Sequence, residues 1–326
     1  MANAEDDLVQ RLFVPLATSA ASRGLLDDAA DITPPAGADI VLTLDTIAEG
    51  VHFPVDADPA DIAVRALGVN LSDLAAKGAT PFGYMMSLST RPGTPFAWYE
   101  AFAAALGGEQ ARHGLPLLGG DTITADGPVT VSITALGTVP AGGMTPRGGA
   151  RPGDRIFVTG TIGDAALGLM MLDPGAVADV HGEVRAWLVD RYQRPQPRTP
   201  LASAVQRFAR AAMDISDGLA VDLDRMCAAS GVGATVFVET VPLSAPATLA
   251  LVFQPDLMTT CITGGDDYEL LMAVPPANID ALVAAAAQAG IQITEIGQFI
   301  RAGGARFLSH YGGDVALPSR GYSHIR

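Results

Sequence analysis

Hydrophobic positions in the first 140 residues follow the spacing of helices in some segments and of strands in others. Residues 58–79 and 95–114 carry apolar side chains three and four apart, which predicts two helices. Asp58 is the expected N-cap of the first, and Gly114 lies near the end of the second. A short amphipathic helix is expected at residues 1–16. The runs that predict strands are 39–46, 81–90, 115–122 and 129–139.

The second half restarts after residues 140–153, a segment dense in glycine and proline that is the predicted domain boundary. Strands are predicted at 154–160 and 234–243, a pair of strands within 257–274, and helices at 161–172 and 279–290. Neither half shows strict alternation of strand and helix. The fold class expected is therefore α+β, with two mixed α/β domains at residues 1–145 and 146–326.

Charge narrows the choice of partners. The chain has 35 acidic and 20 basic side chains, a net charge of −15, which argues against nucleic acid or an anionic membrane as the main partner. Its only lysine is Lys77, so arginines or metal ions must bind any anion. The longest alanine-rich run, residues 281–290, is too short to span a bilayer.

The two cysteines, Cys227 and Cys261, form neither a disulfide framework nor a zinc cluster. They indicate a reducing compartment, and the acidic, polar N-terminus is unlike a signal peptide. We therefore expect a cytoplasmic protein.

Carboxylates recur where apolar runs end or begin. They are Asp27, Asp28, Asp45, Asp73, Asp121, Asp214, Asp217, Asp266 and Asp267. Carboxylate oxygens suit Mg²⁺, which binds through a few acids together with substrate phosphates. For each aspartate alone, the alternative is a helix cap or a turn residue. That alternative weakens as the number of such positions grows.

Other acids and glycines have simpler interpretations. Asp222 lies three residues before Arg225, so Asp222 and Asp224 are expected on a solvated helix face. The glycines of "LGGDT" (118–122) allow a backbone to approach a phosphate, or make a tight turn. In "VTGTIGDAALG" (158–168) the favoured role of Asp164 is to cap the helix, rather than leave its N-terminus to an anion.

Several common catalytic motifs are missing from the sequence. Lys77 is not in a Walker A context, and the protein-kinase motifs and the Gly-x-Ser-x-Gly elbow are absent. The five histidines lack zinc-ligand spacing. His52 follows Asp45 closely and could reach the same cleft, although a structural role is the common one for a single histidine.

A set of motifs occurs in a characteristic order over nearly the whole chain: "DTIAEGVHF", "NLSDLAAKGATP", "LLGGDT", "RYQRPQPR", "MDISDGLAVDL", "GGDDYEL" and "GYSHI". With them the chain resembles the thiamine-monophosphate kinase family, in the superfamily of aminoimidazole ribonucleotide synthetase. The resemblance implies direct transfer of the γ-phosphoryl group of ATP to thiamine phosphate. This is the last step of thiamine diphosphate biosynthesis, with several Mg²⁺ ions and no phosphoenzyme.

The resemblance also assigns residue roles. It implies metal ligation, with catalytic roles for the acids, at Asp28, Thr43, Leu44 (through its backbone), Asp45, Asp73, Asp121, Asp214 and Asp217. It implies ATP contacts at Gly120, Asp121, Arg147 and Ser216. It implies thiamine phosphate contacts at His52, Asp266 and Tyr322.

The family resemblance further implies a homodimer in which the N-terminal sheets of two subunits pair into a barrel. The N-terminal domain would bind ATP and metal and form the dimer. The C-terminal domain, expected to be sandwich-like, would complete the active-site cleft. Neither a nucleic acid nor a membrane is expected as a partner.

Three departures from the family pattern bear on the site. "GLLDD" replaces a Gly-Ile-Gly before the first aspartate pair, "GDTITADGP" lacks an arginine, and "GGDDYEL" has Asp266 where Glu is usual. Two alternatives remain open. One is a superfamily relative, such as selenophosphate synthetase or the hydrogenase-maturation protein, and the other is a nucleotide-binding protein without activity. The cysteine positions argue against the first, since those relatives use a cysteine or selenocysteine near a terminus.

Overall fold

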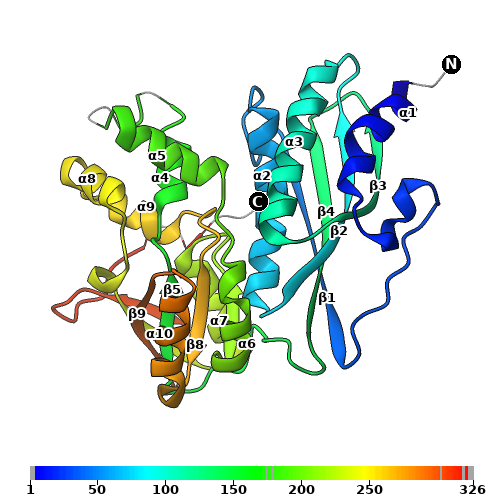
Figure 1. The fold of residues 1–326 in the computed structure, drawn as a ribbon. Helices are drawn as coiled ribbons and strands as arrows, with labels where there is room; N and C mark the ends of the chain where they lie inside the picture. Colours follow the sequence, from blue (N-terminus) through cyan, green and yellow to red (C-terminus); the bar gives the residue numbers. More distant parts are fainter. Residues whose placement is uncertain (1–3, 174, 178–179, 302, 318–319, 322–326) are drawn as a thin grey trace. The chain divides into compact units, whose positions relative to one another are not determined.

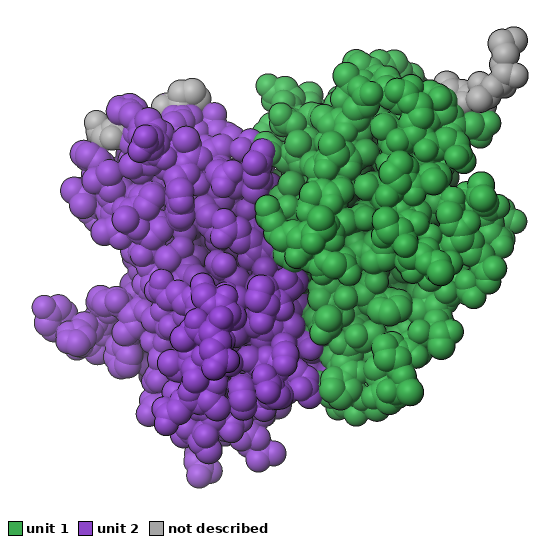
Figure 2. All heavy atoms as spheres, viewed as in Figure 1, with its two compact units in different colours: residues 1–74, 79–143 green, residues 75–78, 144–326 purple. Residues whose placement is uncertain are grey.

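The computed structural model describes residues 4–173, 175–177, 180–301, 303–317 and 320–321. The chain divides into two compact units, coloured separately in Figure 2. Unit 1 comprises residues 1–74 and 79–143, and unit 2 comprises residues 75–78 and 144–326. Each contains one sheet with helices, which confirms the predicted mixed α/β character.

Unit 1 is built on a four-stranded sheet in the order β1-β4-β2-β3. Its strands are β1 (Ala38–Ala48), β2 (Thr80–Thr90), β3 (Leu117–Thr124) and β4 (Thr130–Pro140). β4 pairs antiparallel with β1 and β2, whereas β3 lies parallel to β2. Helices α2 (Pro59–Ala76) and α3 (Phe96–His113) cover one face of this sheet (Figure 1).

The ends of these helices match the sequence predictions. Asp58 accepts a hydrogen bond from the backbone N–H of Ala60 at 2.9 Å and so caps α2. Gly114 ends α3 in the left-handed region, at φ 69°. The expected N-terminal helix is present as α1 (Ala4–Leu8), a π-helical turn (Val9–Phe13) and a 3₁₀ turn (Val14–Leu16).

The two faces of the unit 1 sheet differ in exposure. Along β1, Val41 and Ile47 are buried, whereas Leu42 and Leu44 point to the other face and are 64% and 63% exposed. Met85 on β2 and Ile123 on β3 are also exposed. One face of the sheet is thus covered by helices, and the other carries exposed apolar side chains.

Unit 2 is built on a six-stranded sheet in the order β10-β7-β9-β5-β8-β6. Its strands are β5 (Arg155–Thr159), β6 (Ala211–Asp214), β7 (Gly233–Phe237), β8 (Leu270–Val274), β9 (Ile293–Ile300) and β10 (Ala305–Leu308). Its helices are α4 (Asp164–Met170), α5 (Gly182–Gln193), α6 (Ala202–Phe208), α7 (Leu219–Ser230), α8 (Ala245–Phe253), α9 (Leu257–Thr263) and α10 (Ile279–Gln288). β10 runs parallel to β7, and the other pairs are antiparallel.

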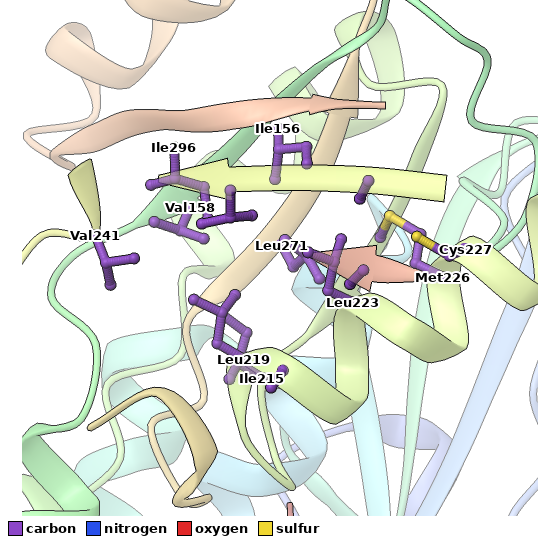
Figure 3. Close-up of a cluster of buried hydrophobic side chains, with 14 of the residues drawn as sticks. Ile156, Val158, Ile215, Leu219, Leu223, Met226, Cys227, Val241, Leu271 and Ile296 are labelled. Carbon is purple, nitrogen blue, oxygen red and sulfur yellow. The ribbon is translucent and has the colours of Figure 1, made fainter. Parts of the chain in front are cut away.

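The core of unit 2 fixes α7 against the sheet. Figure 3 shows Leu219, Leu223 and Met226 of α7 facing the side chains of the strands. All three are fully buried, and burying a side chain of this size contributes about 1.5–3 kcal/mol. Ile215, in the loop before α7, joins the same cluster. This packing anchors the loop at 215–218 on the core of unit 2.

One predicted element is wrong. Residues 257–274 were expected to hold two strands, but the first part is helix α9 and only the second is a strand, β8. The β-branched residues of "LMTTCIT" suggested a strand. The buried positions Leu257, Cys261 and Ile262 instead follow the spacing of a helix, because this segment packs on α4 and α7.

Among the described residues, no helix combines the length and the apolar character needed to cross a membrane.

Candidate functional site

A cavity of about 220 Å³ in unit 1 brings together three of the predicted site residues: Asp28, Gly120 and Asp121. Asp27 lines it as well, and Phe13 and Leu117 contribute to an apolar wall. The cavity has polar and apolar lining side by side, which is the usual composition of a ligand site.

Gly120 is required by the close approach of two strands. A Cβ atom at this position would lie 2.0 Å from the carbonyl oxygen of Met86 on β2. Asp121 follows it on β3 and is exposed, as is Asp28. Among the described residues neither carboxylate has an ion pair, so both are available to a cation.

The third residue of the "GLLDD" departure, Leu26, needs no unusual backbone conformation. Leu26, where the family pattern has glycine, has φ −100°, which any residue adopts, and its side chain is 82% exposed. Leu25 instead carries the unusual backbone, at φ 55°, and lines the cavity. The backbone near the aspartate pair is therefore strained at Leu25, whereas Leu26 fits its position.

Strand β1 and helix α2 place a second group of predicted residues. Thr43 donates a hydrogen bond to Asp73 on α2 at 2.5 Å. The backbone N–H of Asp45 donates to Oδ1 of Asn70 at 3.1 Å, and Asn70 is fully buried. Sequence reasoning missed Asn70, although it lies three residues before Asp73 and therefore on the same helix face.

His52 lies in the turn after β1, and the backbone fixes its ring. Its Nδ1 accepts a hydrogen bond from the N–H of Ala48 at 3.1 Å. A neutral ring therefore carries its proton on Nε2.

In unit 2, β6 ends at Asp214, which is 7% exposed. The segment containing Arg147 runs beside this strand, since the N–H of Ala212 donates to the carbonyl of Pro146 at 2.9 Å. The Arg147 side chain is exposed. Arg147, a predicted ATP contact, thus lies on a segment beside the strand that ends at Asp214.

Asp222 corrects one expectation. It was predicted on a solvated face, but it is fully buried. Its Oδ2 accepts hydrogen bonds from the N–H groups of Ser216 and Asp217, at 3.1 and 3.0 Å, and Arg225 donates to its Oδ1 at 2.7 Å. Burial raises the pKa of Asp222 to about 6. Its role is to fold the "DISD" loop back onto α7.

Asp217 does not cap α7. The N-cap position is Gly218, at φ 120°, and no side chain accepts a cap hydrogen bond there. Asp217 is instead paired with Arg225, which also binds Asp222. One guanidinium therefore neutralises two carboxylates, and one of them, Asp217, is a predicted metal ligand.

The "GGDDYEL" loop hydrogen-bonds directly to the "DISD" loop. The N–H of Asp266 donates to the carbonyl of Ser216 at 2.8 Å, and the N–H of Tyr268 donates to that of Ile215 at 2.9 Å. A Cβ atom at Gly265 would lie 2.3 Å from the Ser216 carbonyl oxygen, so only glycine fits. The structure thus brings together Ser216 and Asp266, two residues with different predicted roles.

The residue that caps the N-terminus of α4 also differs from the prediction. Asp164 was the expected cap, but Asp267 accepts from the N–H groups of Gly163 and Ala165, at 2.7 and 3.2 Å. Asp164 accepts from the hydroxyls of Thr161 and Ser244 instead. Burial raises the pKa of both carboxyls, that of Asp267 well above its ordinary value.

Tyr322 lies outside the described residues. The neighbouring Gly321 packs closely on α7, where a Cβ atom would lie 2.2 Å from Cγ1 of Val221 and 2.8 Å from the carbonyl oxygen of Asp217.

The predicted metal ligands are divided between the units: Asp28, Thr43, Leu44, Asp45, Asp73 and Asp121 in unit 1, and Asp214 and Asp217 in unit 2. In the described part of the chain, no three acids, histidines or cysteines gather into a group that could hold a metal ion. The available donors are nevertheless carboxylate oxygens. They fit Mg²⁺, which completes its coordination with water and substrate phosphates.

Comparison with known proteins identifies the family. The N-terminal domain model of AIR synthase related proteins matches residues 26–139, and the C-terminal domain model matches residues 151–308. The chain therefore belongs to the AIR synthase related protein family.

Within this family, the chain is a member of the thiamine-monophosphate kinase group. It is 41% identical to the thiamine-monophosphate kinase of Caulobacter vibrioides, over 98% of this chain and 90% of the relative. It is 38% identical to that of Salmonella typhimurium, over 100% of this chain and 99% of the relative.

Solved structures agree with this placement. The crystal structure of thiamine-monophosphate kinase from Stenotrophomonas maltophilia K279a superposes with a TM-score of 0.81 at 37% identity, covering 89% of this chain and 91% of that one. A structure of AaThiL complexed with AMPPCP and TMP superposes with a TM-score of 0.78 at 27% identity, covering 90% and 89%. The hydrogenase maturation protein HypE, at 19% identity, shares the fold.

Proposed function

We propose that this protein is a thiamine-phosphate kinase: it transfers the γ-phosphoryl group of ATP to thiamine phosphate, giving thiamine diphosphate and ADP. The observation that carries the proposal is the cavity lined by Asp28, Gly120 and Asp121, in a chain whose relatives at these identities are thiamine-monophosphate kinases. The ThiL structure that contains an ATP analogue together with TMP supports both substrates.

The reaction joins two anionic phosphates, so catalysis depends on charge neutralisation and positioning. The chain has a single lysine, and the cavity of unit 1 is lined by carboxylates. Asp28, Thr43, the backbone of Leu44, Asp45, Asp73, Asp121, Asp214 and Asp217 are the residues that would hold Mg²⁺. When bound, Mg²⁺ supplies the positive charge that stabilises the transferring phosphoryl group.

The chain's own residues perform the remaining tasks. Gly120, Arg147 and Ser216 contact ATP. His52, through Nε2, and Asp266 contact thiamine phosphate, with Tyr322 as a third contact. The carboxylate of Asp266 complements the positive thiazolium ring. Asp214 and Asp217 precede α7, and Asp222 holds their loop.

We also propose a homodimer in which the unit 1 sheets of two subunits pair into a barrel. The exposed apolar residues Leu42, Leu44, Met85 and Ile123 support this, since a sheet face of this kind is normally covered. The roles predicted for the domains at 1–145 and 146–326 belong to the same proposal. So does a cytoplasmic location, where ATP is available.

The dimer is tested by replacing Leu44 with aspartate. A charge on this open sheet face disfavours association, so L44D is expected to elute as a monomer in light-scattering chromatography while the wild-type protein elutes as a dimer. Replacing the exposed Val283 on α10 with aspartate is the matched control, which keeps the dimer. A wild-type monomer contradicts this part of the proposal.

The activity is tested by a coupled ADP-release assay with Mg²⁺–ATP and a set of acceptors. Release is expected with thiamine phosphate, and only at background level with thiamine, with selenide or without an acceptor. Nucleotide binding without release in the presence of thiamine phosphate would indicate a non-catalytic relative. ATP consumption that depends on selenide and leaves AMP would indicate a selenophosphate synthetase.

A further inference from the structure

The "GGDDYEL" loop has an unusual backbone. Asp266 and Tyr268 both have positive φ, 73° and 51°, and neither is a glycine. This region is unfavourable for a residue with a Cβ atom, and it persists only where the surroundings hold the chain firmly. The loop needs an anchor, and the side chains of Asp267 and Glu269 provide it.

Glu269 is fully buried and its carboxylate is fully paired. Thr159 donates to Oε2 at 2.6 Å, Arg191 donates to Oε1 at 2.9 Å, and Arg198 donates to Oε2 through Nε at 2.6 Å and to Oε1 through Nη2. Both arginines come from "RYQRPQPR", a sequence motif to which the proposed reaction gives no role. We call Glu269 with Thr159, Arg191 and Arg198 the Glu269 clamp.

The clamp has little freedom to rearrange. A Cβ atom at Gly160 would lie 2.2 Å from Oε1 of Glu269 and 2.6 Å from Nη2 of Arg198, so the backbone directly after β5 packs against the ion pair. The hydroxyl of Thr159 also accepts from the N–H of Leu270 at 2.7 Å, which ties the clamp to β8. The carboxylate of Glu269 therefore has one position.

The backbone of the clamped residue connects it to the site. The carbonyl of Glu269 accepts from the N–H of Ile215 at 2.8 Å. Tyr268 and Asp266 continue this ladder onto Ile215 and Ser216. Ser216 directly follows Ile215, which makes the clamp's backbone bond, and Asp266 lies three positions before Glu269.

We propose that Glu269 is a positioning residue: held by Arg191 and Arg198, it sets the place of Ser216 and Asp266 without contacting either substrate. The inference rests on the proposed function only for the roles of those two residues. A positioning role for Glu269 has one consequence that a purely structural role lacks. Weakening the clamp loosens the ladder at residues 215, 266 and 268 beyond what a general loss of stability causes.

The test compares Glu269→Gln and Arg198→Lys with Asp154→Asn. Gln keeps the volume and removes the charge, and Lys keeps the charge and removes the two-pronged contact. Arg198 is the less buried arginine, so its variant is the milder one and decides the matter if E269Q does not fold. Asp154 is a buried acid in the same unit that accepts from Arg210 and from the N–H of Arg151, both at 2.8 Å, away from the ladder.

Amide hydrogen exchange, resolved by residue in the ligand-free protein, gives the first readout. Exchange at Ile215, Asp266 and Tyr268 is expected to speed up about tenfold or more in E269Q and R198K, but not in D154N. The inference is overturned if these amides exchange as in wild type, or if D154N accelerates them equally.

Steady-state kinetics give the second readout. KM for thiamine phosphate and for ATP is expected to rise about three- to tenfold in E269Q and R198K and to stay near wild type in D154N. Unchanged KM values in both clamp variants overturn the inference. Because the exchange measurement needs no substrate, it decides on the clamp even if the wild-type protein fails to phosphorylate thiamine phosphate.

Discussion

The two units hold their carboxylates in opposite ways. In unit 1, Asp28 and Asp121 are exposed at a cavity, and neither has an ion pair among the described residues. In unit 2, Asp222 and Glu269 are fully buried and bound by arginines of the same unit. The two acids of unit 1 are open to a cation from outside the chain, whereas these acids of unit 2 are neutralised by side chains of their own unit.

This difference separates catalysis from architecture. A buried carboxylate is stable only with partners that compensate its charge. Removing one member of a buried pair leaves the other as an uncompensated charge, which destabilises the fold. An exposed carboxylate costs little to replace and contributes little to folding. Substitutions in the unit 1 cavity should therefore change activity at constant stability, and substitutions of the buried acids of unit 2 should change stability as well.

Removal of divalent metal is expected to have the largest effect. Excess chelator should lower phosphoryl transfer by about a thousandfold or more, since a metal supplies several kcal/mol of charge stabilisation and each 1.36 kcal/mol corresponds to about tenfold in rate. Added Mg²⁺ should restore the rate. Turnover that persists in chelator would show that the acids of unit 1 need no cation.

Asp121→Asn tests the unit 1 side of the comparison. We expect kcat to fall about 100-fold, with an unchanged melting temperature, because Asp121 is an exposed, proposed metal ligand and its replacement breaks no internal ion pair. Asp126→Asn, an exposed aspartate in the turn after β3, is the control and should keep wild-type values for both. A melting temperature that drops with normal turnover would assign Asp121 to the architecture instead.

Asp222→Ala tests the unit 2 side. It leaves the N–H groups of Ser216 and Asp217 without their acceptor and removes a partner of Arg225. We expect the free energy of unfolding to fall by about 2–3 kcal/mol, from lost hydrogen bonds in a buried position. Denaturant titration measures it. A loss below about 0.5 kcal/mol, typical of surface positions, would contradict the assignment.

Asp267→Asn should change how stability depends on pH. The folded-state pKa of Asp267 is raised, so the folded protein binds this proton more tightly than the unfolded chain does. Stability associated with this group is present at low pH and is lost as pH rises through the folded pKa. The wild-type protein should therefore lose more stability than D267N between about pH 4, near the ordinary pKa, and neutral pH. Parallel pH curves of the two proteins would show that the raised pKa is absent.

Much of the fold could be predicted from the spacing of apolar residues. The caps at Asp58 and Gly114 and the mixed α/β character are confirmed. These features depend on local chemistry, in which one residue determines one backbone conformation. The segment at 257–263 was misread because its β-branched residues favour a strand locally, and its helical form is set by packing on α4 and α7.

The types of residue in the candidate site could be predicted from the sequence, but the ion pairs and hydrogen bonds between them could not. The motifs pointed to Asp121 and Asp217, but nothing in their spacing showed that Arg225 binds Asp217 and Asp222 together. That arrangement depends on Gly218 at φ 120°, which turns the loop back over α7. Likewise Asp267 rather than Asp164 caps α4, because residues about 100 positions apart meet in the fold.

Direct transfer from ATP to thiamine phosphate is the central claim, and a quenched reaction with ATP labelled in its γ-phosphate tests it most directly. We expect the label in the terminal phosphate of thiamine diphosphate, one for each ADP formed, with none on the protein at any time. Label bound to the protein, or ADP formed without labelled thiamine diphosphate, would contradict the account.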